Sequence, residues 1–175
     1  MLRDTLHDVI GPALSRLPAR MDSLEARVLL LAVGLQESRM TYRRQLGGPA
    51  RGLWQFEVGT PETRGGVTGV LLHPASRNYL VSICTARELR PEAHAIYEQL
   101  EHDDVLAAIV ARLLLWTDPA PLPAVTDADA AWAYYLRTWR PGKPHPETWH
   151  MLHARARAAV EAVSVPTLSP TVSET

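Results

Sequence analysis

Glu37 is the residue whose type and position best suit acid–base chemistry. Leu30, Val33 and Gly34 precede it at helical spacings, so the four residues share one face of a predicted helix. Glu37 therefore ends an apolar stripe. A carboxyl group held against apolar neighbours loses solvation, and its pKa rises. Such a group can stay protonated near neutral pH and donate a proton to a glycosidic oxygen. The alternative is a helix-terminal glutamate whose carboxylate lies in water.

A glycine-rich segment, residues 48–57, follows Glu37 after a predicted turn. Its glycines allow the backbone to approach a ligand closely. Trp54 offers a flat face for stacking on a sugar ring, and the Gln55 amide could bind hydroxyl or acetamido groups. The alternative is a tight turn with its apolar side chains in the core.

Two tyrosines lie next to each other on a predicted helix late in the chain, within the stretch Ala130-Ala131-Trp132-Ala133-Tyr134-Tyr135. Either Tyr134 or Tyr135 could reach the same cleft as Glu37. The alternative is an aromatic stripe packed in the core.

The elements that must position these residues are mostly helices. Apolar periodicity predicts helices over 2–17 with a kink or restart at Pro12, and over 23–39, 74–89, 91–100, 104–116, 126–139 and 146–163. A capping box at 22–25 is predicted to open the second helix, and Asp103 is predicted to cap the helix that ends at Trp116. Pro74 and Pro91 stand at plausible first positions of their helices.

The glycine distribution and the C-terminal composition set the remaining boundaries. Residues 41–70 hold seven of the ten glycines, which predicts a loop region. Whether this region also contains short strands is left open by the sequence. Residues 164–175 are rich in Ser, Thr and Pro and lack periodicity. We therefore expect one domain over 1–163 and a flexible tail over 164–175.

Together, Glu37-Ser38, Gly52-Leu53-Trp54-Gln55 and the Ala/Tyr helix resemble the soluble lytic transglycosylase and goose-type lysozyme group. In that group a Glu-Ser pair, a Gly-Leu-Met-Gln-like loop and an Ala-Tyr-Asn-like stretch follow in the same order. The resemblance covers residues 23–139 and implies a mainly α, lysozyme-like fold.

The resemblance also implies roles for single residues. Glu37 would be the general acid/base, Gln55 a substrate-contacting amide and Tyr134 the active-site tyrosine. The further substrate contacts would come from Ser38, Trp54 and Tyr135. This chain departs from the family pattern at two positions, because Trp54 stands where Met is usual and Tyr135 stands where Asn is usual.

The reaction type depends on whether a second carboxylate faces Glu37. A conventional glycosidase places two carboxyl groups across the scissile bond, and spacing singles out none of the four candidates. These are Glu57, Glu62, Asp118 and Asp127. The resemblance instead implies one glutamic acid and no carboxylate nucleophile. The acetamido group of muramic acid would assist. The 6-hydroxyl of the same sugar would attack its C1 carbon to give a 1,6-anhydro product.

Composition argues against several other classes. The net charge of −1 does not favour a broad basic surface for nucleic acid. Cys84 is the only cysteine, which excludes an intrachain disulfide and a Cys-rich zinc site. The apolar runs are too short to span a bilayer. His145, His150 and His153 could hold zinc, but no further ligand completes the set at a telling spacing. We therefore predict no metal and no cofactor.

More narrowly, residues 45–52 and 135–144 look like a lysozyme-like protein found in tailed phages. The first residues lack the continuous apolar core of a secretion signal, and the net charge gives no long-range attraction to an anionic wall. We expect a virion protein that is made in the host cytoplasm and acts in the bacterial cell wall or periplasm. Its partners would be peptidoglycan glycan strands and other virion proteins, and a homo-oligomer within the particle is compatible with this role.

Two alternatives to this role stay open. The protein could be a phage structural or assembly protein that keeps a lysozyme-like fold with little or no activity, because fold alone does not decide function. It could also be a lysin released through a holin's membrane lesion.

Overall fold

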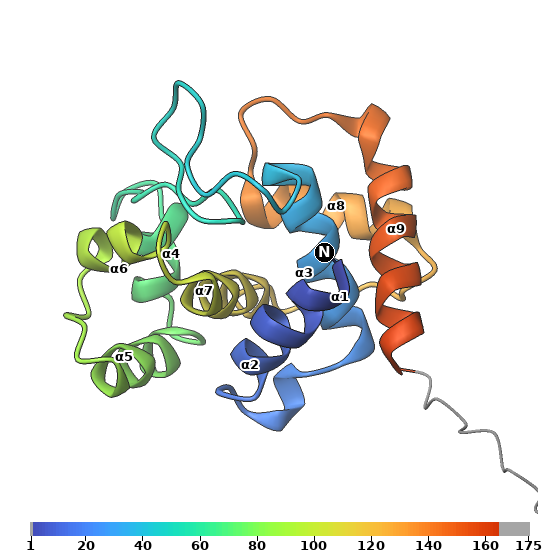
Figure 1. The fold of residues 1–175 in the computed structure, drawn as a ribbon. Coiled ribbons are helices and arrows are strands. Elements are labelled where there is room, and N and C mark those ends of the chain that lie inside the picture. The colour runs from blue at the N-terminus through green and yellow to red at the C-terminus, as the bar shows by residue number, and fades with distance from the viewer. Residues whose placement is uncertain (1, 165–175) are drawn as a thin grey trace, which may run out of the picture.

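The computed structural model describes residues 2–164, and these are mainly helical, as the sequence predicts (Figure 1). In chain order the elements are α1 (Leu2–Thr5), a π-helical turn η1 (Leu6–Ile10), α2 (Gly11–Leu14), a 3-10 turn η2 (Ala19–Met21), α3 (Leu24–Ser38), α4 (Gly66–Leu72), α5 (Arg77–Ala86), α6 (Ala93–Gln99), α7 (Asp104–Trp116), α8 (Ala128–Trp139) and α9 (Pro146–Ser164). Extended pairing within the described range is limited to the isolated bridges Arg44–Arg51 and Arg51–Phe56.

Helices α3 and α7 form the centre of the molecule. Residues 28–35 of α3 and residues 106–113 of α7 are all buried. A helix that is apolar all round must be covered on every side. Helix α3 packs along α9, and α7 lies between α4 and the N-terminal helices (Figure 1). The end of α3, which carries Glu37, is therefore held by the core.

Side-chain caps fix where the central helices begin. The Asp103 carboxylate accepts from the backbone N–H of Leu106 at 2.7 Å, which confirms the predicted cap of α7. Ser23 caps α3 by accepting from the Ala26 N–H at 3.2 Å. The predicted reciprocal capping box is wrong. Asp22, its first residue, instead forms a bidentate ion pair with Arg27, with both N···O distances at 2.7 Å.

Proline changes the N-terminal helix locally without breaking it. Pro12 has no N–H, and its ring would clash with the carbonyl four residues earlier. The preceding turn widens into η1, in which the Gly11 N–H bonds to the Leu6 carbonyl. The predicted irregularity at Pro12 is therefore a π-helical turn.

The glycine-rich region contains a helix that periodicity missed, α4. Gly59 and Gly66 both have positive φ, 72° and 56°. A Cβ at Gly59 would lie 1.8 Å from the Gly65 carbonyl oxygen, and one at Gly66 would lie 2.2 Å from that of Glu57. Only glycine permits this crossing of two backbone segments, and it leads the chain from the loop into α4.

Several other predicted helix boundaries are displaced. Helix α5 begins at Arg77 and α6 at Ala93, so Pro74 and Pro91 precede these helices instead of opening them. Helix α9 includes Ser164, which the sequence placed in the tail. The rest of the predicted tail, residues 165–175, lies outside the described residues.

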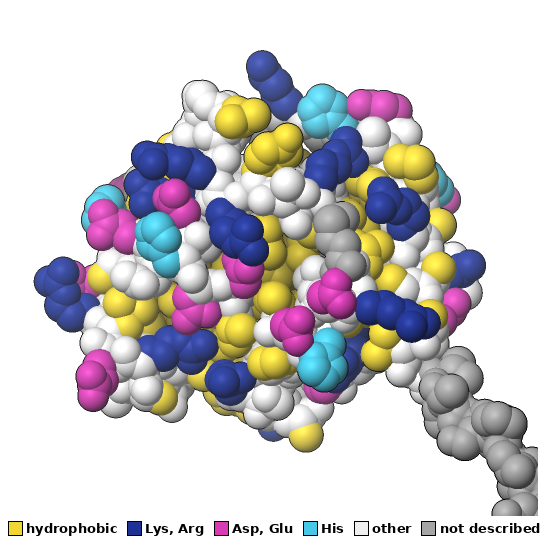
Figure 2. Space-filling model, viewed as in Figure 1, with side chains coloured by type: hydrophobic (Ala, Val, Ile, Leu, Met, Phe, Trp, Pro, Cys, Tyr) yellow, Lys and Arg dark blue, Asp and Glu magenta, His cyan; other side chains and the backbone are white. Residues whose placement is uncertain are grey.

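Two further observations concern the surface. None of the described helices has the length and apolar character needed to cross a membrane. On the face that Figure 2 shows, Lys and Arg side chains are interspersed with Asp and Glu side chains.

Candidate active site

A cleft of about 880 Å³ lies between the glycine-rich loop and the connection from α8 to α9. In Figure 1 these two segments project at the same end of the molecule, above α3 and α8. The loop contributes Gln55, Phe56 and Glu57, and the connection contributes Arg140 and Lys143. The volume is within the range of known ligand sites.

Glu37 lies in this cleft and is partly buried. Burial raises the pKa of its carboxyl group from 4.5 to about 7, because removal from water penalises the charged form. The Tyr135 hydroxyl donates to Glu37 Oε1 at 2.6 Å, which lowers the pKa by a smaller amount. The carboxyl group is thus a weak acid that is held at a fixed place in the cleft, unlike a carboxylate in open water.

An aromatic cluster holds Tyr135 against Glu37. The Tyr135 ring stacks on Trp149 with centroids 5.3 Å apart and planes 14° apart, and Trp132 lies 5.3 Å from it. Burial and the neighbouring Glu37 carboxyl group both raise the pKa of the Tyr135 hydroxyl. Tyr135 therefore stays protonated and acts as a donor to Glu37.

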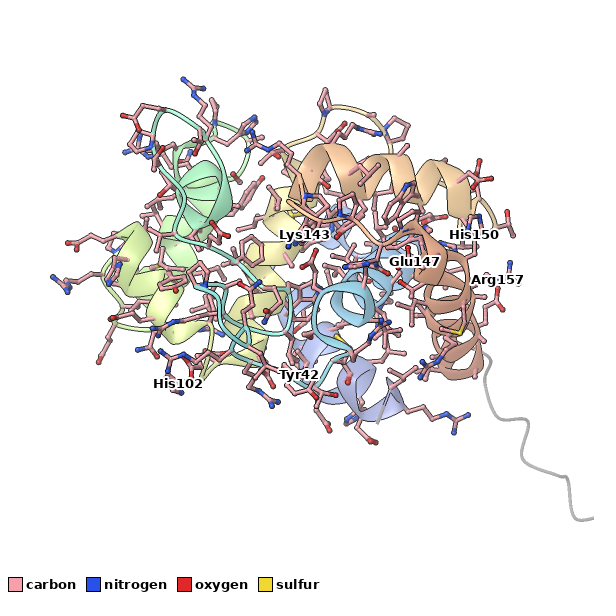
Figure 3. All side chains as sticks on the ribbon, turned by 90° about the horizontal axis from the view of Figure 1, so that it is seen from above. Tyr42, His102, Lys143, Glu147, His150 and Arg157 are labelled. Atoms are coloured by element: carbon pink, nitrogen blue, oxygen red, sulfur yellow. The ribbon has the colours of Figure 1, made fainter. Side chains whose placement is uncertain are left out.

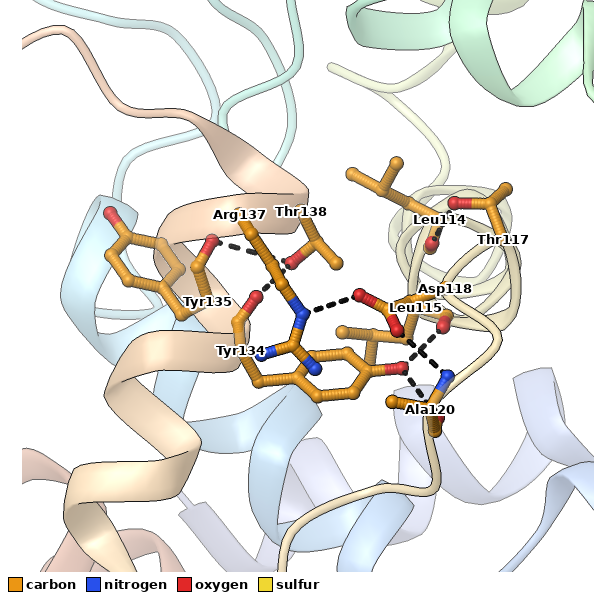
Figure 4. Close-up of polar contacts among 9 residues, drawn as sticks. All are labelled: Leu114, Leu115, Thr117, Asp118, Ala120, Tyr134, Tyr135, Arg137 and Thr138. Atoms are coloured by element: carbon orange, nitrogen blue, oxygen red, sulfur yellow. Dashed lines mark hydrogen bonds and ion pairs between the residues drawn. The ribbon is translucent and has the colours of Figure 1, made fainter.

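The assignment of Tyr134 as the active-site tyrosine is wrong. Its hydroxyl donates to the Leu115 carbonyl at 2.8 Å, and the Arg137 guanidinium lies 4.2 Å from its ring centroid. Figure 4 shows Tyr134 and Tyr135 leaving α8 in different directions, with only Tyr135 directed at α3. Adjacent residues on a helix are about 100° apart, so only one of the two can face Glu37.

Trp54 cannot stack on a sugar as the sequence suggested, because its side chain is 0% exposed. Its indole Nε1 donates to the Leu30 carbonyl of α3 at 2.8 Å. Its own carbonyl accepts from Trp139 Nε1 at 3.1 Å. Trp54 is thus an anchor that fixes the loop to α3 and α8. Trp139 is among the aromatic side chains that line the cleft instead, a role that the sequence did not indicate.

Ser38 also has a structural role instead of a substrate contact. Its side chain is buried, and Oγ donates its one hydrogen to the Leu53 carbonyl at 2.7 Å, with the Gly34 carbonyl 3.2 Å away. It also accepts from the Met40 N–H at 3.1 Å. These bonds tie the last turn of α3 to the loop, so the Glu-Ser pair combines a cleft residue with the residue that positions it.

Gln55 lines the cleft, as the sequence suggested, but its donor group is already used. Nε2 donates to the Tyr42 carbonyl at 3.1 Å and to the Gly52 carbonyl at 2.9 Å. Because an amide nitrogen has two hydrogens, a contact with a bound sugar would use Oε1 as an acceptor.

Of the four candidates for a second carboxylate, only Glu57 lines the cleft. Asp118 bonds to Arg137 at 2.6 Å, and Asp127 caps α8 by accepting from the Ala130 N–H at 2.9 Å. Glu62 is exposed and lies outside the cleft lining. The structure therefore reduces the two-carboxylate alternative to one pair, Glu37 and Glu57.

Cationic and amide side chains form the other wall. Arg140 donates from Nη1 to the Thr63 carbonyl at 3.2 Å and from Nη2 to the Arg64 carbonyl at 3.0 Å, across the cleft. Gln36, which precedes Glu37, donates to the His145 carbonyl at 3.1 Å. These bonds hold the α8–α9 connection in place. Arg137, which lies three residues before Arg140, bonds instead to Asp118, and neither Arg137 nor Asp118 lines the cleft.

Each of the three histidines that suggested a zinc site contacts a different neighbouring residue. His145 lies 3.0 Å from a Glu147 oxygen and His150 lies 2.9 Å from an Asp129 oxygen, while His153 is buried beside Trp149. Figure 3 shows His150 and Arg157 along α9 and His102 at the other end of the molecule. Across residues 2–164, no group of three or more His, Cys, Asp or Glu could hold a metal ion.

The hydroxyl of Tyr135 gives a direct test of this geometry. In the wild-type protein the hydrogen bond from Tyr135 stabilises the Glu37 carboxylate. Tyr135→Phe removes this bond, so the pKa of Glu37 should rise above its wild-type value. In the matched variant Tyr134→Phe it should stay unchanged. The measurement is a pH titration of the Glu37 side-chain carboxyl carbon by NMR. Equal shifts in both variants, or none in either, would contradict the assignment of Tyr135.

Comparisons with known proteins returned no matching family model, no matching curated protein and no matching solved structure.

Proposed function

We propose that this protein is a lysozyme-like lytic transglycosylase, which cleaves the β-1,4 bond between N-acetylmuramic acid and N-acetylglucosamine in peptidoglycan. The observation that carries the proposal is the Glu37 carboxyl group, which has a pKa of about 7 and a tyrosine donor and lies in a large cleft. At neutral pH such a group can both donate and accept a proton. The resemblance of the Glu-Ser, Gly-Leu-Trp-Gln and Ala/Tyr segments supports the same assignment.

The reaction needs two proton transfers at one residue. Protonated Glu37 donates its proton to the glycosidic oxygen, and the bond from that oxygen to C1 of muramic acid breaks. The 6-hydroxyl oxygen of the same sugar then bonds to C1 and passes its proton to the Glu37 carboxylate. The product is a 1,6-anhydro sugar, and Glu37 returns to its starting state. The Tyr135 hydroxyl supports the charged intermediate state by its bond to Oε1.

The cleft walls suit a glycan strand. Trp139 provides apolar surface and packs on the buried Phe56 ring, with centroids 5.8 Å apart, and Gln55 and Thr63 provide polar atoms nearby. Sugar rings present apolar faces and hydroxyl edges, so a wall of this mixed character matches them. Arg140 and Lys143 add positive charge, which favours the carboxylate groups that peptidoglycan carries.

The position of Glu57 favours a second candidate function, a hydrolase that uses two carboxyl groups. In that mechanism Glu57 would act across the scissile bond as a base or nucleophile, and the product would be a reducing sugar. The two functions share Glu37 and differ in whether Glu57 is needed.

The proposed activity is tested with purified protein and isolated peptidoglycan sacculi. We expect the wild-type protein to release soluble muropeptides. A folded wild-type protein that binds sacculi but releases no muropeptides would contradict the enzyme assignment. That outcome would support the alternative of a structural or assembly protein with a lysozyme-like fold.

We also propose that the protein acts as part of a phage particle. Its net charge of −1 and the mixed charges on the face that Figure 2 shows provide no general attraction to an anionic wall, so delivery by tethering would supply the local concentration. Proteomics of washed particles should find a fixed number of copies per particle. Absence from particles of a phage that still needs this protein for lysis would support a released lysin instead.

A further inference from the structure

Lys143 is the only lysine in the chain, and it lines the cleft that holds Glu37. Its side chain is exposed and forms no hydrogen bond or ion pair within residues 2–164. Arg140, which lines the same wall, is instead fixed by its bonds to the Thr63 and Arg64 carbonyls. Lys143 is therefore the cation of this wall that can turn toward a bound ligand.

The backbone that carries Lys143 is restricted on both sides. Pro141 and Pro144 have fixed φ angles, and a residue that precedes proline is itself biased toward extended conformations. Just beyond them, the His145 carbonyl accepts from Gln36 Nε2 at 3.1 Å, which fastens the segment to the end of α3. The base of the Lys143 side chain is thus held in place, while its four-carbon stem stays flexible.

These anchors bring Lys143 within reach of a sugar bound at Glu37. Gln36 is the neighbour of Glu37 in α3. The chain from His145 back to Lys143 spans at most about 7 Å, because it covers only two residues. Figure 3, which looks down on the end of the molecule that holds the cleft, shows Lys143 near the middle. A ligand whose reacting bond lies at Glu37 can therefore present a second group to the Lys143 ammonium.

The charges of the cleft favour an anionic group at this position. The Lys, Arg, Asp and Glu residues of its lining are Glu37, Glu57, Arg140 and Lys143. While Glu37 is protonated, the two cations face only one carboxylate, that of Glu57. No ion pair joins Glu57 to Lys143 in the described part of the chain. An incoming carboxylate thus meets an excess of positive charge at this wall.

We propose that Lys143 binds a carboxylate carried on the lactyl group of muramic acid. This inference rests on the proposed function, which makes muramic acid the ring whose C1–O bond breaks at Glu37. The lactyl group is attached to that same ring. Its carboxylate is free in strands without peptide, and in peptide-bearing strands the stem peptide supplies the nearest carboxylates. An ammonium suits both, because a compact charge with rotatable donors can pair with a carboxylate from several directions.

Binding is measured by calorimetry on the Glu37→Gln protein, which keeps the cleft but does not cleave the ligand. One probe is a tetrasaccharide of alternating N-acetylglucosamine and N-acetylmuramic acid with free lactyl carboxylates. The second carries stem peptides on its lactyl groups, and the third has its lactyl carboxylates converted to neutral methylamides. These three probes separate the two sources of carboxylate from the sugar rings that they share.

Lys143→Gln should weaken binding of a carboxylate-bearing probe by about 5-fold, the upper range for an ion pair in contact with water. The effect should shrink at high salt, and the methylamide probe should bind unchanged. Lys143→Arg keeps the charge and should bind like the parent protein. Arg155→Gln makes the same change of net charge at an exposed residue of α9 outside the cleft, and it should also bind like the parent.

The outcomes identify the carboxylate and decide the proposal. A loss confined to the peptide-bearing probe assigns the stem carboxylate, and a loss confined to the peptide-free probe assigns the lactyl carboxylate. Unchanged binding of both by Lys143→Gln, an equal loss for the methylamide probe or in Arg155→Gln, or no saturable binding of any probe would overturn the inference. Cleavage of sacculi by the wild-type protein is measured separately. Unchanged binding with cleavage refutes this inference alone, whereas selective binding without cleavage refutes the enzyme assignment alone.

Discussion

Replacing Glu37 by glutamine is expected to reduce muropeptide release by about 100- to 10,000-fold, the usual contribution of a general acid/base. The amide keeps the shape of the side chain and can still accept from the Tyr135 hydroxyl, but it cannot transfer a proton. Release is measured on isolated sacculi near pH 6, where Glu37 is mostly protonated.

The same substitution should stabilise the protein at high pH. Glu37 has a folded-state pKa of about 7 against an ordinary value of 4.5, so the folded state binds the proton more tightly. Stability of the wild-type protein therefore falls as the pH rises from 4.5 to about 7, because folding must then bury a charge. Glu37→Gln avoids this cost, on the order of 3 kcal/mol above pH 7, and the difference vanishes below pH 4.5.

Glu57→Gln is the matched control for Glu37→Gln. It makes the same change on an exposed carboxylate of the same cleft. We expect near-wild-type release of muropeptides. Equal cleavage by Glu37→Gln and wild type would contradict the role of Glu37. Loss of cleavage in both variants would support the two-carboxylate hydrolase.

Trp54→Ala is expected to destabilise the protein by about 3–5 kcal/mol, which is typical of a large cavity in a core. Trp54 is fully buried and bonds to α3 through its indole, so its loss frees the loop that forms one wall of the cleft. The free energy of unfolding is measured by urea denaturation.

Trp54→Phe provides the graded comparison. It keeps an aromatic ring but loses the bond to the Leu30 carbonyl, so we expect a smaller loss of about 1–2 kcal/mol. A Trp54→Ala protein with wild-type stability and weakened glycan binding would instead restore the sugar-stacking role that the sequence suggested.

The sequence predicted the parts of the fold that local chemistry determines. Apolar periodicity predicted α3 and α7. Asp103 predicted the start of α7, because its carboxylate can accept from the backbone N–H of the third residue beyond it. Helix α4 was not predicted. The glycines that allow two backbone segments to cross there have no side chains, so they contribute nothing to an apolar periodicity. The helix starts predicted at Pro74 and Pro91 were wrong, since proline also suits the turn before a helix.

The site was predictable only to the level of segments. The apolar face that ends at Glu37 was visible from spacing alone, and its burial follows from that face. The choice between Tyr134 and Tyr135 could not be made from spacing, because the rotation of α8 against α3 is set by the packing of residues that are distant in sequence. Trp54 and Ser38 were assigned to substrate because sequence cannot tell a buried donor with a backbone acceptor from one that faces a cleft.

The identity of the cleavage product tests the central claim most directly, namely that Glu37 acts without a second carboxylate. Muropeptides released from sacculi by the wild-type protein are analysed by mass spectrometry, with Glu57→Gln treated in parallel. We predict 1,6-anhydro muropeptides, lighter by one water than hydrolytic products, from both proteins. Reducing-end muropeptides from the wild-type protein, together with loss of all release by Glu57→Gln, would contradict this account and establish a hydrolase.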